Sequence, residues 1–249
     1  MQDIPYYVLS ALAVLLTLTV HEYAHAWAAY KMGDPTAKNL GRLTLNPIKH
    51  LDPIGALCML VFHFGWAKPV PITPRNFKNP RRGFAISALA GPAINLVISF
   101  FSAFAYLLLL SIFSSAFSRG GIPSALAFSF AENSILFFYL LHIINLGIAI
   151  FNLLPIPPLD GSRILGLLLP PKQYFAIMRH EKTIYYVMLG WLLVGDVLSG
   201  IVLSLPGASG NIVLKLFANI LSLSNLLGLA IDKISVLIQN FWLLLLPFI

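Results

Sequence analysis

Two histidines four residues apart, with a glutamate beside the first, stand near the end of the first apolar stretch, in the order His21-Glu22-Tyr23-Ala24-His25. Side chains at this spacing lie on one face of a helix, so both imidazoles can reach a single metal ion. Glu22 is then placed to act as a general base on a water molecule without being a ligand itself. The pattern predicts a zinc site with His21 and His25 as ligands and Glu22 as the catalytic base.

The third ligand of such a site has to come from elsewhere in the chain. Catalytic zinc usually takes three protein ligands, and the position six residues beyond the second histidine is Lys31. The best remaining carboxylate is Asp160, in the segment 152–161, which reads NLLPIPPLDG. Its prolines interrupt a helix and Gly161 allows a sharp turn. We expect Asp160 to be the third ligand, with helix capping as the alternative for this residue.

Two asparagines interrupt otherwise apolar stretches near these candidates. Asn95 ends the sequence GPAIN, and Asn152 opens the proline-rich segment. An asparagine close to zinc can hydrogen-bond a substrate backbone or a developing oxyanion, so both are predicted to bind substrate. Bonding to a neighbouring helix is the alternative. His142 and Asn145 share a helical face with Asn152, and we expect them to bond neighbouring helices.

The elements that position these residues belong to a chain too apolar for a soluble protein. Hydrophobic residues make up 58% of the 249 positions and charged residues 10%, against about 45–50% and about 25% in soluble domains. Too few polar residues remain to cover a soluble surface. The same composition excludes disorder and nucleic-acid binding, and the single cysteine, Cys58, excludes an intrachain disulfide. The sequence therefore predicts an integral membrane protein.

Apolar stretches of about 20 residues predict the membrane-spanning helices. The clear stretches are 4–30, 84–117, 134–154, 184–205 and 212–231. Residues 53–65 are too few to span comfortably and are expected to be re-entrant or to lie on the surface. Residues 234–249 form either a short span or an interfacial helix. This predicts one all-α polytopic membrane domain over residues 1–249 with about five to six transmembrane helices.

The basic residues orient this domain. Nine of the 16 lie between the first and second spans, four between the third and fourth, and Lys233 follows the fifth. Arg119 and Lys215 alone fall on the opposite side. We therefore expect the N-terminus outside the cell and the zinc site toward the cytoplasmic side.

The basic stretch 39–79 is predicted to be extended rather than helical. Residues 41–45 alternate polar and apolar side chains, and residues 66–74 read WAKPVPITP. Prolines two positions apart leave one strand edge without N–H donors, so pairing in the middle of a sheet is excluded. We expect a small membrane-associated β region whose edge accepts an extended peptide. A merely structural hairpin is the alternative.

Taken together, the HEYAH, GPAIN and NLLPIPPLDG sequences resemble the site-2 protease family of intramembrane zinc metalloproteases, over roughly residues 15–165. The resemblance implies a three-helix catalytic core that holds one zinc ion per chain through His21, His25 and Asp160. It further implies that Glu22 is the base, that Asn152 helps to hold substrate, and that the β region presents the peptide.

The resemblance thus implies a zinc metalloendopeptidase that cleaves transmembrane segments, either in regulated intramembrane proteolysis or in clearance of signal-peptide remnants. Its partners would be a transmembrane protein or peptide and the lipid bilayer of a bacterial or archaeal inner membrane. A homo-oligomer is an open alternative to a monomer. The core would cover about 4–170, with the extended region at 39–80, followed by helices over about 184–249. PDZ and CBS domains, which many relatives carry, have no room here. A membrane metal-ion transporter with the same His/Asp site is the alternative, in which Glu22 would be replaceable by glutamine.

Overall fold

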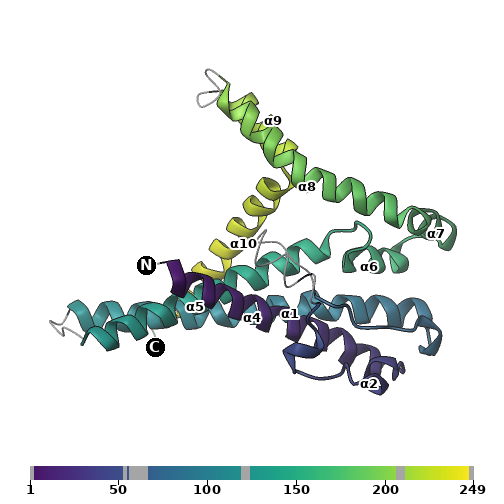
Figure 1. Ribbon diagram of the computed structural model, residues 1–249, viewed down its shortest axis with the longest axis horizontal. Helices are drawn as coiled ribbons and strands as arrows, with labels where there is room; N and C mark the ends of the chain where they lie inside the picture. Colours follow the sequence, from purple (N-terminus) through teal and green to yellow (C-terminus); the bar gives the residue numbers. More distant parts are fainter. Residues whose placement is uncertain (1–2, 53–54, 56–66, 119–123, 206–210, 247–249) are drawn as a thin grey trace.

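The computed structural model describes residues 3–52, 55, 67–118, 124–205 and 211–246, and these residues are mostly helical (Figure 1). In chain order the α-helices are α1 (Asp3–Lys31), α2 (Thr36–Asn39), α4 (Pro80–Ser118), α5 (Ala125–Leu153), α6 (Asp160–Leu168), α7 (Pro171–Arg179), α8 (Glu181–Ser204), α9 (Ile212–Leu221) and α10 (Leu223–Leu245). Short 3₁₀ turns cover Pro47–Lys49 and Pro74–Asn76.

Five of these helices, α1, α4, α5, α8 and α10, are long and apolar enough to cross a membrane. They confirm the expected all-α membrane protein. The first four of them overlap the stretches expected at 4–30, 84–117, 134–154 and 184–205. The fifth expected stretch, 212–231, is divided between α9 and α10.

The helices α1, α4 and α5 lie side by side and form the centre of the molecule (Figure 1). Small side chains suit this close packing, and Ala13 of α1, Ala103 of α4 and Ala149 of α5 are completely buried. Helices in a membrane gain little from hydrophobic burial against one another, so close contact through small residues and hydrogen bonds takes its place. One such bond runs from the Asn145 amide of α5 to Thr17 Oγ1 of α1, at 2.8 Å.

The short helix α6 is attached to the beginning of α4. The Arg81 guanidinium of α4 donates hydrogen bonds from Nε to the carbonyl of Gly166, at 2.8 Å, and from a terminal nitrogen to the carbonyl of Leu169, at 2.7 Å. These carbonyls lie at the end of α6, where a helix has no internal donors left for them. Arg81 therefore fixes the position of α6, whose first residue is Asp160.

The prediction of one span over 212–231 is wrong, because two helices share this stretch. The helix α9 ends at Leu221, and Ser222 has an extended backbone (φ −102°, ψ 115°) before α10 begins. Hydroxyl groups of Ser222 and Ser224 donate to the Asp196 carboxylate of α8, the second at 2.9 Å. This polar contact from a distant helix holds the chain at the break. Residues 234–245 are the second half of α10 rather than a separate segment.

The predicted β region is also wrong as far as residues 39–52 and 67–80 are concerned. They form no strand, and their one bridge pairs Leu51 with Ala67. Beyond that bridge the segment 67–73 is neither helix nor strand, and its prolines remove donors that a strand ladder needs. Two of its remaining N–H groups bind carboxylates instead, since Val70 donates to Glu22 at 2.7 Å and Thr73 to Asp34 at 2.6 Å. The re-entrant segment expected at 53–65 lies, apart from position 55, outside the described residues, as does Trp66.

Candidate metal centre

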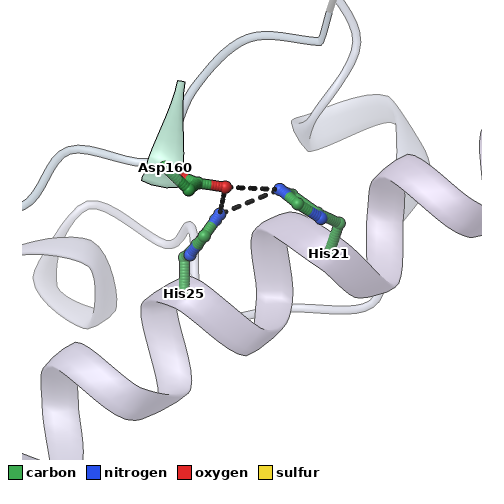
Figure 2. A group of neighbouring side chains, drawn as sticks. All are labelled: His21, His25 and Asp160. Carbon is green, nitrogen blue, oxygen red and sulfur yellow. Dashed lines mark hydrogen bonds and ion pairs between the residues drawn. The ribbon is translucent and has the colours of Figure 1, made fainter. Parts of the chain in front are cut away.

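The histidines of α1 face each other on one side of the helix (Figure 2). The two Nε2 atoms are 2.9 Å apart, and both rings are nearly inaccessible to solvent. His21 and His25 are about one helical turn apart, and this spacing brings their rings together, as the sequence predicts. Two ring nitrogens at this distance need a shared proton or a cation between them, because two lone pairs repel each other.

Asp160 joins the two histidines from the start of α6 (Figure 2). Its Oδ2 atom lies 3.2 Å from the Nε2 atom of His21 and 3.2 Å from that of His25. The turn that brings it there depends on Gly161, where an added Cβ would come within 2.6 Å of the backbone carbon of Leu153 and clash with its carbonyl. Backbone at the end of α5 cannot give way, so only glycine allows α6 to begin this close to it.

The three side chains fit a zinc ion. Bonds of about 2.0–2.2 Å in a tetrahedral arrangement hold ligand atoms about 3.3–3.6 Å apart, so shifts of a few tenths of an ångström would suffice here. Asp160 Oδ2 is buried and pairs only with these two histidines among the described residues, so it faces the position that a cation would occupy. Burial alone opposes ionisation of Asp160, but the neighbouring imidazoles of His21 and His25 outweigh it and hold the pKa of this carboxyl well below its usual range. Two imidazoles and a carboxylate are ligands that zinc accepts. Among the described residues, this is the group of His, Cys, Asp and Glu side chains whose spacing suits a metal ion.

The helix α4 backs both histidines. His25 Nδ1 lies 2.7 Å from the carbonyl oxygen of Ser87, and His21 Nδ1 lies 3.1 Å from Nδ2 of Asn95. Between them, Gly91 faces the two rings so closely that a Cβ atom there would lie 2.5 Å from His25 Cε1 and 2.7 Å from His21 Cε1. The absence of a side chain at Gly91 is therefore what lets α4 approach the site.

Glu22 lies on α1 beside the histidines and is partly buried. Its Oε2 atom accepts the hydrogen bond from the backbone N–H of Val70, so the irregular segment 67–73 runs next to this carboxylate. A carboxylate held by one backbone donor keeps its other oxygen for a further partner.

The other predicted residues have different surroundings. The Asn152 amide donates to the Ile148 carbonyl of its own helix at 3.0 Å and is partly buried. Asn95 is completely buried against His21. His142, as expected, bonds neighbouring helices, through Ser99 of α4 at 2.8 Å and Ser235 of α10 at 2.9 Å. The substrate-binding roles of Asn95 and Asn152 stay predictions.

Three contributors to the site were missed in the sequence. Ser87 and Val70 act through backbone atoms, which carry no signal in the residue type. Gly91 was part of the GPAIN sequence, but its closeness to the histidines depends on how α4 packs on α1. The signal that could have found two of them is spacing, because Ser87, Gly91 and Asn95 recur every four residues along α4 and so share one face.

The comparison with known families agrees with this geometry. The sequence profile of peptidase family M50, the site-2 protease family, matches residues 9–195. The chain belongs to this family. An M50 peptidase is a metalloprotease, so the predicted zinc metalloprotease and its zinc cofactor are confirmed at the level of the family.

Individual M50 relatives point the same way. The name "Putative zinc metalloprotease" is carried by YwhC of Bacillus subtilis, which is 40% identical over 216 residues, or 87% of this chain and 92% of YwhC. Rip2 of Mycolicibacterium smegmatis carries the same name and is 30% identical over 171 residues, or 66% of this chain and 58% of Rip2. Rip2 of Mycobacterium tuberculosis strain Erdman is 27% identical over 192 residues, or 71% of this chain and 67% of that protein. No solved structure was found to match this M50 chain.

Proposed function

We propose that this M50 peptidase hydrolyses peptide bonds within transmembrane segments of other membrane proteins. The observation that carries the proposal is the meeting of His21, His25 and Asp160 at the buried face of a helix long enough to cross a membrane. A protease with its site on such a helix reaches substrates that are themselves in the bilayer. Single spans that unwind locally are the substrate class, such as membrane-anchored regulators or remnant signal peptides.

His21, His25 and Asp160 hold the metal in this proposal, and each chain holds one ion. When bound, zinc supplies a Lewis acid that polarises the scissile carbonyl and activates water. Glu22 takes a proton from the attacking water and gives it to the leaving amine. Asn152, in the last turn of α5 before the chain turns toward Asp160, hydrogen-bonds the substrate backbone. The segment 67–73 supports the role of Glu22, because the N–H group of Val70 donates to this carboxylate and helps to hold it in place.

The distribution of basic residues supports an orientation with the N-terminus outside and the metal centre toward the cytoplasm. The HEYAH sequence lies in the last third of α1, close to the basic stretch that follows this helix. Water would reach Glu22 from that side.

A paired experiment on purified protein tests the function. Zinc content and cleavage of a tagged single-span membrane protein are measured for the wild type and for Glu22→Gln. General acid–base catalysis contributes about 10²- to 10⁴-fold. We expect about one zinc per chain in both proteins. The rate of cleavage by Glu22→Gln should be at least about 100-fold below that of the wild type. Glu132→Gln is the matched control, since Glu132 is an exposed carboxylate of α5, and it should cleave like the wild type.

Other results would contradict the proposal. A folded wild type without zinc would exclude the metal centre. Bound zinc with cleavage equal in the wild type and Glu22→Gln would exclude Glu22 as the base. Zinc ions moved across a vesicle membrane by both proteins, with no cleavage by either, would favour a transporter built on the same side chains.

A further inference from the structure

The face of α4 that meets the metal centre is a stripe of three residues, Ser87, Gly91 and Asn95, spaced one helical turn apart. All three are buried, and the outer two each contact one histidine on its Nδ1 side. Ligand histidines commonly bond a second group through the ring nitrogen that does not face the metal. The α4 stripe is in the right place to do this for both rings.

The contact between His25 and Ser87 defines one of the two tautomers. A backbone carbonyl only accepts hydrogen bonds, so at 2.7 Å the Nδ1 atom of His25 carries the proton. In the neutral ring this places the lone pair on Nε2, which faces Asp160 and can bind a metal ion. The carbonyl of Ser87 therefore selects the tautomer of His25 that binds metal.

The contact between His21 and Asn95 is less simple, because an amide group can present either its nitrogen or its oxygen. In the structure Nδ2 faces His21 Nδ1 at 3.1 Å, and Oδ1 is buried with no hydrogen-bond partner. A donor at this position requires an unprotonated Nδ1, which places the proton of a neutral His21 on Nε2. That proton would occupy the direction in which a metal has to bind. This orientation therefore suits a site that holds a proton between its nitrogens, not one that holds zinc.

Turning the amide by half a revolution reverses both assignments. Asn95 Oδ1 then accepts a hydrogen bond from His21 Nδ1–H, and the Nε2 lone pair of His21 faces Asp160. The amide oxygen, which has no partner in the present orientation, gains one. We propose that Asn95 is a positioning residue for the metal, which presents its amide oxygen to His21 when zinc is bound. Together with the carbonyl of Ser87, it fixes both histidines as ligands through Nε2. This role replaces the substrate contact predicted for Asn95 and rests on the zinc site of the proposed function.

The complete burial of Asn95 agrees with a role toward His21 rather than toward a substrate. Asn145 provides a matched comparison, because it is equally buried, also leaves its Oδ1 without a partner, and bonds Thr17 away from the histidines. Any effect of losing a buried amide from the bundle would appear at both positions. An effect on the metal would appear only at Asn95.

The experiment measures the zinc dissociation constant by competition with a chelator, for the purified wild type, Asn95→Leu, Asn95→Asp and Asn145→Leu. Loss of a partner of this kind weakens metal binding by about 10- to 100-fold. We expect that weakening in Asn95→Leu, an affinity close to the wild type in Asn145→Leu, and an affinity within about threefold of the wild type in Asn95→Asp. The aspartate keeps an acceptor and has no amide nitrogen, so it separates the two orientations.

Equal affinity in Asn95→Leu and the wild type would overturn the inference. An equal loss of zinc affinity in Asn95→Asp and Asn95→Leu would also overturn it, provided that unfolding curves show both variants to be folded. If Asn95→Asp does not fold, ¹⁵N NMR of histidine-labelled, zinc-loaded wild type decides the question: a protonated Nδ1 on His21 supports the inference and a protonated Nε2 refutes it. A wild type that binds zinc but cleaves nothing would count against the proposed function alone, whereas absence of zinc binding would end both.

Discussion

Gly91→Ala should remove zinc from this protein while leaving most of its fold in place. The added methyl group would point from α4 at the rings of His25 and His21, at 2.5 Å and 2.7 Å from their Cε1 atoms. Carbon atoms in contact prefer about 3.5–4.0 Å. The rings would therefore have to retreat by about 1 Å, or α4 would have to move away from α1 by a similar distance.

That movement can be compared with what a metal site tolerates. Zinc–nitrogen bonds of about 2.0–2.1 Å are held to within about 0.2 Å. A shift of about 1 Å exceeds this several-fold for both histidines at once. Since loss of an outer partner alone costs about 10- to 100-fold in affinity, displacement of two ligands should weaken zinc binding by at least about 100-fold. Overpacking should lower the free energy of unfolding by about 1–3 kcal/mol.

The assay is chelator competition for zinc together with thermal unfolding in detergent. Gly228→Ala is the matched control, because Gly228 lies inside the helix α10 and a Cβ there would meet nothing within 4 Å. It should bind zinc like the wild type. Zinc affinity of Gly91→Ala within about threefold of the wild type would refute the argument, since the rings would then have accommodated a methyl group without losing the metal.

Two further predictions concern the segment beside the site. Burial by itself disfavours ionisation of Asp34, but hydrogen bonds to the carboxylate, of which the one from Thr36 is the strongest, outweigh it and hold the pKa of Asp34 below its usual 3.8. The ionised form therefore stabilises the fold above about pH 4, and this stability is lost as the pH falls through the lower pKa of the folded state. Thermal unfolding should show Asp34→Asn less stable than the wild type at pH 7, with the difference shrinking below pH 4, and a constant difference would contradict this. Val70→Pro removes the N–H group that binds Glu22, so kcat should fall about tenfold or more with zinc affinity unchanged, as loss of a bond to a charged group of about 1.5–3 kcal/mol implies. Val70→Ala, which keeps the N–H group, should retain kcat, and equal losses in the two variants would show that the side chain matters instead.

The metal centre could be predicted from the sequence because its strongest signals are local. Histidines four residues apart on a helix are neighbours in any fold, so the pairing of His21 with His25 could be predicted without knowing the tertiary structure. Asp160 was found by a different argument, since a carboxylate after several prolines in a membrane protein has few explanations. The structure brings all three within 3.2 Å of one another.

The failures arise where a distant element decides the local structure. Hydropathy counts Ser222 as a small interruption in an apolar run, whereas Asp196 of another helix holds that residue in an extended conformation. The prolines correctly predicted that the chain near Val70 is not helical. Whether such backbone joins a strand depends on what faces it, and here the facing groups are the carboxylates of Glu22 and Asp34. Neither partner can be identified from the residues of the segment itself.

The contacts of the site divide it into two parts that different elements control. His21 and His25 contact α4 through Asn95 and the carbonyl of Ser87, so their geometry depends on the packing of α4 on α1. Among the described residues, Glu22 accepts a hydrogen bond from the N–H group of Val70, in the segment 67–73, and not from α4. A displacement of that segment would therefore alter the position of Glu22, the proposed base, while the proposed ligands His21 and His25 stay where they are. A variant of the segment 67–73 should therefore keep its zinc and lose kcat. Loss of zinc and kcat together in such a variant would show that the two parts of the site move as one.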